Sequence, residues 1–318
     1  MSHPWVPGVL SSEPFLIVAG GYRCGTTSLF GYLADHPDVN PCTIKEPGFF
    51  FSLRIAGQPP AYPPGHEATA YLSLFRRRSA RVRLEATSNY LGDPGAAARI
   101  GACLPNARVV LLLRDPVSRL QSWYTFLRLQ AQLDPALGFE DWIRLQLDDR
   151  RPPAQRPYEL QAVTHGFYAG AVAEFLKALG PERVAVVWFD DLKRDPAAVM
   201  RRVCGLAGLD PARYGGYDFS TRNESQRLRS PRAFALYRRL HTRAFSLLRA
   251  FPHLQFRLKE IFFGALEPRF IGLFTEPAEP AEAPSSLLRE LRAHYAPDLA
   301  PLAAVVGTPA PWATEYRR

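Results

Sequence analysis

The sequence predicts an α/β fold of three layers, in which a central parallel sheet is flanked by helices. Two observations carry this prediction: short apolar runs of strand length alternate with longer segments of helical pattern, and no internal repeat is visible. At 318 residues and 47% hydrophobic, the chain is long enough to bury a full core. We therefore expect a single domain over residues 1–318.

Four apolar runs are predicted to form strands of the sheet, at Phe15–Ala19, Arg81–Glu85, Val109–Leu113 and Val184–Phe189. The carboxyl ends of parallel strands lie at one edge of a sheet, and ligands of such folds bind there. The loops that follow these runs are therefore expected to carry the functional residues.

The first run passes through a glycine-rich loop, Gly20 to Gly25, directly into a segment of helical pattern. Glycines allow tight turning, and the N-terminus of a helix presents unpaired N–H donors to an anion. The loop lacks the Gly-Lys pair of the P-loops that hydrolyse ATP or GTP, because Thr26 follows Gly25. The positively charged residue of this loop is Arg23, which comes earlier in the loop. We therefore predict a P-loop-like loop that binds an anionic ligand, with the reacting group of that ligand next to Arg23.

Three further segments bear on the function. In the first, Lys45-Glu-Pro precedes the aromatic run Phe49–Phe51. In the second, an apolar run ends in Arg114-Asp-Pro and continues into a helical stretch that contains Ser122. In the third, a later apolar run leads into Asp190-Asp-Leu. Together with the loop, and in this order and spacing, these segments resemble the sulfotransferases that use 3′-phosphoadenylyl sulfate, in particular those that act on carbohydrates and heparan sulfate.

The resemblance implies 3′-phosphoadenylyl sulfate as donor, adenosine 3′,5′-bisphosphate as product, and a carbohydrate, glycolipid or glycosylated natural product as acceptor. Glu46 would be the general base that takes the proton of the acceptor hydroxyl, while Arg23 and Lys45 stabilise the developing charge. Arg23 stands where the family usually has lysine. The residues implied in donor binding are Gly21, Tyr22, Arg23, Cys24, Gly25, Thr26, Thr27, Ser28, Arg114, Ser122, Tyr168 and one or more of Arg227, Arg229 and Ser230. Those implied in acceptor binding are Glu46, Thr87, Ser88 and Tyr90.

Simpler interpretations of these residues stay open. Glu46 is alternatively a surface carboxylate paired with Lys45. The aromatic run Phe49–Phe51 argues against this, because it should draw the backbone into the core and leave Glu46 at the mouth of a cleft. Arg114 is alternatively a helix-capping or charge-neutralising group, and Tyr168 an ordinary core residue.

The net charge of +9 is concentrated at about residues 222–262, where apolar residues recur at near-helical spacing. This segment is predicted to be a basic helical lid over the acceptor, with peripheral membrane contact as one alternative and a helix pair packed on the core as another. Two other functions stay open: a non-catalytic protein that binds nucleic acid or anionic lipid, and a small-molecule kinase with a degenerate P-loop. Because no nucleic-acid motif is present, we expect no nucleic-acid partner.

Four cysteines, at positions 24, 42, 103 and 204, show no paired spacing, and no secretory or long apolar segment is evident. We therefore expect a cytoplasmic protein with reduced thiols. Cys24 is interpreted as a packing residue of the loop, with an oxidation-sensitive thiol as the alternative. Metal-ligand spacing is not seen, and no metal is expected.

Overall fold

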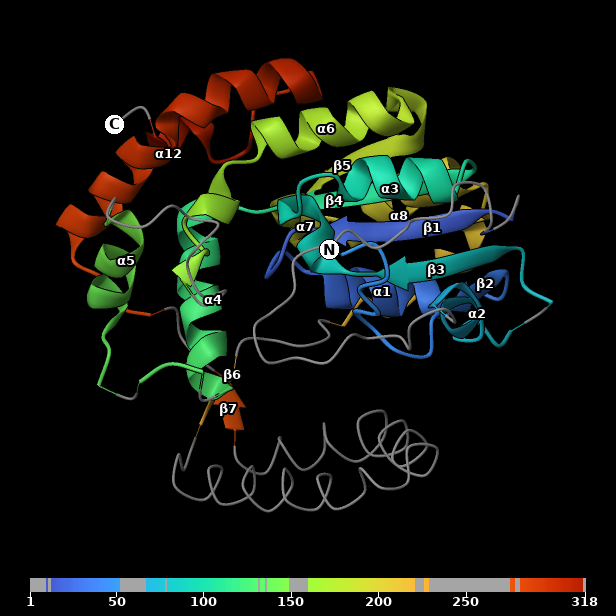
Figure 1. The fold of residues 1–318 in the computed structure, drawn as a ribbon, viewed down its shortest axis with the longest axis horizontal. Helices are drawn as coiled ribbons and strands as arrows, with labels where there is room; N and C mark the ends of the chain where they lie inside the picture. Colours follow the sequence, from blue (N-terminus) through green and yellow to red (C-terminus); the bar gives the residue numbers. More distant parts are fainter. Residues whose placement is uncertain are drawn as a thin grey trace.

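The computed structural model describes residues 10, 13–51, 67–77, 79–130, 132–134, 136–148, 160–220, 226–228, 275–277 and 281–316. Within them, five parallel strands form a sheet in the order β2-β3-β1-β4-β5. The strands are β1 (Phe15–Gly20), β2 (Val39–Pro41), β3 (Val82–Ala86), β4 (Ala107–Leu113) and β5 (Val184–Trp188). Helices cover both faces of this sheet (Figure 1), so the predicted three-layer α/β fold is confirmed.

The helices of the described residues are α1 (Thr26–Ala34), α2 (Glu67–Leu72), α3 (Ala96–Cys103), α4 (Pro116–Leu129), α5 (Phe139–Leu147), α6 (Ala169–Leu179), α7 (Phe189–Arg194), α8 (Pro196–Ala207) and α12 (Ser285–Val306). Helices α3 and α6 lie side by side over one face of the sheet, while α1 and α8 cover the other (Figure 1). Within the described residues, every helix is too short or too polar to cross a lipid bilayer.

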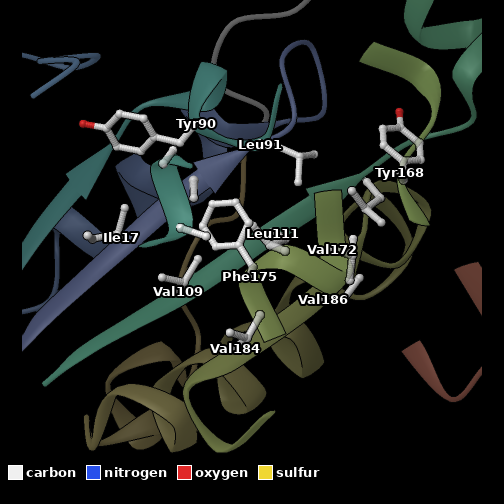
Figure 2. Packing of buried hydrophobic residues seen from close by; sticks show 14 of the residues in the cluster. Ile17, Tyr90, Leu91, Val109, Leu111, Tyr168, Val172, Phe175, Val184 and Val186 are labelled. Carbon is white, nitrogen blue, oxygen red and sulfur yellow. The ribbon is translucent and has the colours of Figure 1, made fainter. Parts of the chain in front are cut away.

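The central strands are apolar throughout because both of their faces are buried. In β1, Phe15, Ile17 and Ala19 contribute to the core on the α3 and α6 side, whereas Leu16 and Val18 contribute to the core on the α1 and α8 side. Figure 2 shows the first core, where Val172 and Phe175 of α6 pack over the strands; the strand residues labelled there are Ile17, Val109, Leu111, Val184 and Val186. This rigid sheet fixes the positions of the loops at its carboxyl edge.

The four predicted strands agree with β1, β3, β4 and β5 to within two residues at each end. The run at Val184 ends one residue early, because Phe189 already begins α7. Strand β2, of three residues, was not predicted, since so short a segment carries no readable alternation.

The predicted basic helical segment at 222–262 lies almost entirely outside the described residues. Within it, Gln226–Leu228 forms strand β6, which pairs antiparallel with β7 (Thr275–Pro277), so the helical prediction is wrong for these three residues. The partner strand is distant in sequence, and helical spacing in the local sequence cannot reveal such a pairing. Strand β6 lies against α4.

Candidate active site

The glycine-rich loop joins β1 to α1 and is tied to the neighbouring strand. The Gly21 N–H donates to the carbonyl of Leu112 in β4 at 2.5 Å, and the Cys24 N–H donates to the Gly21 carbonyl at 3.2 Å. Gly25 stands directly before α1 with a φ of 89°, and a Cβ there would lie 2.9 Å from the ring of Phe189. The close approach and the left-handed backbone together require glycine at this position.

These contacts use two backbone N–H groups of the predicted donor site. The N–H groups of Gly21 and Cys24 donate within the protein and hold the loop in shape, and contact of these two residues with the sulfate donor stays a prediction. The Cys24 side chain is fully buried, and burial raises the pKa of its thiol, which favours the packing interpretation over a reactive one. The amides that remain suited to an anion are those at the start of α1, where Thr26, Thr27 and Ser28 form the first turn.

Arg23, Arg114 and Ser122 come together from three different elements. The Arg23 Nε donates to the Ser122 Oγ at 3.2 Å, and the Arg114 Nη1 donates to the backbone carbonyl of Arg23 at 3.2 Å. Aromatic rings lie beneath both guanidinium groups, with Phe126 4.9 Å from the Arg23 Cζ and Phe189 4.7 Å from the Arg114 Cζ. The loop, the end of β4 and the first turns of α4 therefore form one cationic site.

The electrostatics of this cluster favour an anion. Burial lowers the pKa of the Arg23 guanidinium, and the charge of Arg114 lowers it further. Burial likewise lowers the pKa of Arg114. Two partly desolvated cations that repel each other gain stability when a phosphate binds between them.

Two non-glycine residues in the described part of the chain have positive φ angles, and both were predicted to be catalytic. Arg23 and Glu46 each have a φ of 62°. A left-handed backbone costs such residues about 1 kcal/mol, and strain of this kind clusters at functional sites. This observation points to the same two residues without reference to the sequence motifs.

Glu46 follows β2 and is held by the end of β3. Its N–H donates to the Ala86 carbonyl at 2.8 Å, while its carboxylate accepts from the Ser88 N–H at 2.7 Å and the Ser88 hydroxyl at 2.9 Å. Lys45 forms an ion pair with the same carboxylate. Ser88 also lines a pocket with Gly21 and Tyr22, so the carboxylate that it holds lies close to the glycine-rich loop.

The residues around Glu46 differ in how deeply they are buried. Phe50 is fully buried, as the aromatic run predicts, and Phe49 stacks on Tyr71 with ring centroids 4.3 Å apart. Glu46 itself is exposed, with 35% of its side chain accessible. The ion pair of the simpler interpretation is present, but Ser88 fixes the same carboxylate in addition.

Three predicted contact residues have buried side chains. Thr87 and Tyr90 do not line an acceptor cleft, because both hydroxyls donate to the carboxyl group of Glu85 in the core. The Tyr168 hydroxyl donates to the backbone carbonyl of Arg114 at 2.9 Å. Tyr168 therefore supports Arg114 from the core side.

The remaining predictions concern the segment after residue 220. Arg229 and Ser230 lie outside the described residues, and Arg227 is described only as part of strand β6. Whether any of the three contacts the donor therefore stays a prediction. Among the residues that the structure describes, no group of three or more His, Cys, Asp or Glu side chains could hold a metal ion.

A pocket of about 260 Å³ opens beside the glycine-rich loop. Its wall includes Tyr22 and Ser88, which connect it to Glu46, and Phe167, which is 37% exposed. Arg119 and His165 also line the pocket, and sequence reasoning did not single them out because the resemblance implies no role for either, although Arg119 lies between Arg114 and Ser122. The helical pattern around Arg119 could have placed it on the face of α4 that packs inward.

His165 predicts a pH dependence of stability. Burial and the neighbouring Arg119 lower the pKa of this imidazole from 6.5 to about 4. Between these pH values the unfolded chain binds a proton that the folded protein does not, so stability falls as the pH drops from about 6.5 to 4, by about 3 kcal/mol. Urea unfolding of the protein and of His165→Asn at several pH values should show a smaller loss for the variant. Equal pH slopes would contradict a buried neutral imidazole.

Comparison with known proteins gives a consistent result. A family model described as a sulfotransferase domain matches residues 94–228. The human bifunctional heparan sulfate N-deacetylase/N-sulfotransferase 3 is 27% identical over 209 residues, covering 62% of this chain and 22% of that protein. The membrane-associated sulfotransferase kil1 of Dictyostelium discoideum is 37% identical over 126 residues, which are 38% of this chain and 24% of kil1. The chain thus spans less than a quarter of the length of these curated relatives.

The structural comparison extends over nearly the whole chain. A sulfotransferase from Alicyclobacillus acidocaldarius superposes with a TM-score of 0.63 at 25% identity, covering 97% of this chain and 100% of that one. The family model includes Arg114 and Ser122 but begins after the glycine-rich loop and Glu46. The structural match supplies the agreement over that first part. The chain therefore matches a sulfotransferase domain in sequence over residues 94–228, and over nearly its whole length it is similar to a solved sulfotransferase, the family that its motifs resemble.

Proposed function

We propose that this protein is an enzyme that transfers the sulfuryl group of 3′-phosphoadenylyl sulfate to a hydroxyl of a carbohydrate, a glycolipid or a glycosylated natural product. The observation that carries the proposal is that Arg23, Arg114 and Ser122 lie together at the glycine-rich loop, while Ser88, which holds Glu46, lines a pocket with Gly21 and Tyr22 of the same loop. The proposal treats residues 1–318 as one catalytic domain, with the segment at about 222–262 as a lid over the acceptor.

The donor fits the residues at this edge of the sheet. Members of the family use 3′-phosphoadenylyl sulfate. We assign its 5′-phosphosulfate to the first turn of α1 and Arg23, and its 3′-phosphate to Arg114 and Ser122. When bound, the donor supplies the sulfuryl group, whose bond to the phosphate oxygen breaks as a bond to the acceptor oxygen forms. Arg23 is suited to stabilise the charge of this transition state, since it is a guanidinium held by Ser122 and stacked on Phe126.

Glu46 is assigned as the general base. Its carboxylate is oriented by both the N–H and the hydroxyl of Ser88, and carboxylate oxygens keep further lone pairs for an incoming hydroxyl. It would take the proton of the acceptor hydroxyl as that oxygen attacks sulfur. Lys45, in an ion pair with Glu46, brings a positive charge close to the reacting groups.

The acceptor is assigned to the pocket beside Tyr22 and Ser88. Aromatic and polar groups share its wall, as Tyr22 and Phe167 lie there with Ser88, Asn89 and Thr164. Such a mixture suits the apolar faces and hydroxyl edges of a sugar. The human relative is named for heparan sulfate, which supports a carbohydrate acceptor.

Calorimetric titration with adenosine 3′,5′-bisphosphate, with ATP and magnesium as the parallel titration, tests the donor assignment. We expect micromolar affinity for the bisphosphate and much weaker binding of ATP. Absence of bisphosphate binding, by protein shown to be folded by circular dichroism and cooperative unfolding, would contradict the proposal. Tight binding of ATP with magnesium alone would support the kinase alternative.

Transfer itself is tested with radiolabelled sulfate in the donor. Neutral glycans, glycolipids and anionic polysaccharides, each offered separately, should include at least one acceptor that becomes labelled. The labelled class identifies the acceptor. Labelling of none of them would contradict the assignment of a carbohydrate acceptor even if the donor binds.

A further inference from the structure

A buried carboxyl group lies at the end of β3, next to the segment that carries Glu46. Glu85 is fully buried, and burial raises the pKa of its carboxyl group. Three hydroxyls donate to it: Thr87 at 2.8 Å, Tyr90 at 2.6 Å, and Tyr71. A buried carboxyl is costly unless its oxygens are bonded, and here both are. The proposed chemistry gives Glu85 no role.

Two of these hydroxyls also hold the segment of residues 45–51, which we call the Glu46 loop. The Gly48 N–H donates to the Thr87 Oγ1 at 3.1 Å, and the Phe50 N–H donates to the Tyr90 hydroxyl oxygen at 3.0 Å. Each hydroxyl has a single proton. Since that proton goes to Glu85, the lone pairs of both hydroxyls face the loop as acceptors. The loop N–H groups can only donate, and Glu85 gives each hydroxyl proton a partner, so that a lone pair of the hydroxyl is oriented toward the loop.

The same loop is fixed from two other sides. The Arg99 Nε donates to the Phe50 carbonyl at 2.9 Å, and Asp93 holds Arg99 through a 2.6 Å ion pair. The Glu46 N–H donates to the Ala86 carbonyl. The left-handed backbone of Glu46 is strained, and such a conformation persists only where surrounding contacts hold it. These hydrogen bonds are contacts of that kind.

We propose that Glu85 is a positioning residue, which acts through Thr87 and Tyr90 to hold the Glu46 loop in the conformation that keeps the Glu46 carboxylate at Ser88. The catalytic part of this inference rests on the proposed function, because it takes Glu46 as the base. The anchoring part does not, since it concerns hydrogen bonds of the loop amides alone.

Hydrogen exchange with Tyr90→Phe and Thr87→Val tests the anchoring. Both changes keep the side-chain shape and remove one acceptor of a loop amide. We expect the amide of Phe50 in the first variant, and of Gly48 in the second, to exchange about 10-fold faster or more. Tyr71→Phe is the matched control, because it also loses a hydroxyl bonded to Glu85 but keeps its ring on Phe49. Equal exchange in all three variants would overturn the inference.

Substitution of Glu85 itself gives a second test. Glu85→Gln keeps an oxygen for Thr87 and Tyr90, whereas Glu85→Ala removes it. We expect the glutamine variant to retain most of the protection of Gly48 and Phe50 and the alanine variant to lose it. If Glu85→Ala fails to fold, the Tyr90 and Thr87 variants still decide the question. Equal protection in Glu85→Ala and the unmodified protein would contradict the proposal.

Activity and donor binding separate positioning from general damage. Tyr90→Phe and Thr87→Val should lower kcat about 10-fold, leave the affinity for adenosine 3′,5′-bisphosphate unchanged, and cause no further loss when combined with Glu46→Gln. Faster exchange with unchanged kcat would overturn the positioning role. Full activity of Glu46→Gln would instead remove the proposed base, and the exchange data would still decide whether Glu85 anchors the loop.

Discussion

Replacing Glu46 by glutamine is expected to lower turnover by about 10²- to 10⁴-fold while the affinity for adenosine 3′,5′-bisphosphate stays unchanged. The amide has nearly the shape of the carboxylate but cannot accept the proton of the acceptor hydroxyl. Donor binding should survive, because the hydrogen bonds of the cationic cluster join Arg23, Arg114 and Ser122 to one another and keep their arrangement when Glu46 is replaced. Sulfate transfer and calorimetry on the same preparation measure the two quantities.

Glu182→Gln serves as the matched control for this experiment. Glu182 is an exposed carboxylate just before β5, at the amino ends of the strands and away from the carboxyl edge. Its replacement should leave turnover unchanged. If Glu46→Gln turns over at the rate of this control, Glu46 is not the base. If it loses donor affinity as well as turnover, its role includes the donor site, and the separation into base and cradle would be wrong.

Replacing Arg114 by alanine is expected to weaken binding of adenosine 3′,5′-bisphosphate by roughly 100-fold, since charge-assisted contacts with a phosphate are lost. The guanidinium also donates to the Arg23 carbonyl, so the glycine-rich loop loses one of its supports. The affinity of Arg114→Lys for the bisphosphate should lie between those of the unmodified protein and Arg114→Ala, because an ammonium keeps the charge but cannot form paired contacts with a phosphate. Calorimetry over a range of salt concentrations measures the loss of affinity in each variant and the part of it that comes from charge.

Arg108→Ala is the control for Arg114. Arg108 lies near the amino end of β4, the strand that ends directly before Arg114, and is far from the carboxyl edge where the loops meet, so its replacement should not change donor affinity. An affinity of Arg114→Ala equal to that of this control would exclude Arg114 from the donor site. It would favour the helix-capping interpretation of the Arg114-Asp-Pro motif.

Much of the fold could be predicted because the signals for it are local. Strands β1, β3, β4 and β5 are continuous apolar runs, as strands buried on both faces must be. Strand β2 and strand β6 were not found in the sequence. Each has three residues and is defined by its hydrogen-bonded partner, which for β6 lies far along the chain.

The candidate site was predictable to the same extent. Arg23, Glu46, Arg114 and Ser122 are singled out by the resemblance that their local motifs carry. Local motifs do not show whether the side chain of a nearby residue points into the cleft or into the core. Tyr90 stands two positions after Ser88 and was predicted to share its cleft, yet its hydroxyl lies in the core on Glu85.

The sequence by itself determined the sheet, the glycine-rich loop and the residue types on which the proposed chemistry depends, because these follow from apolar runs, glycines and charges that are neighbours in the chain. Only the tertiary structure decided that Arg23 meets Ser122, that Tyr168 supports Arg114, and that Glu85 holds the Glu46 loop. These contacts join residues that are distant in sequence, and their geometry follows from how the layers pack. A hydrogen bond across such a distance has no local signature, so it becomes visible only when the chain is folded.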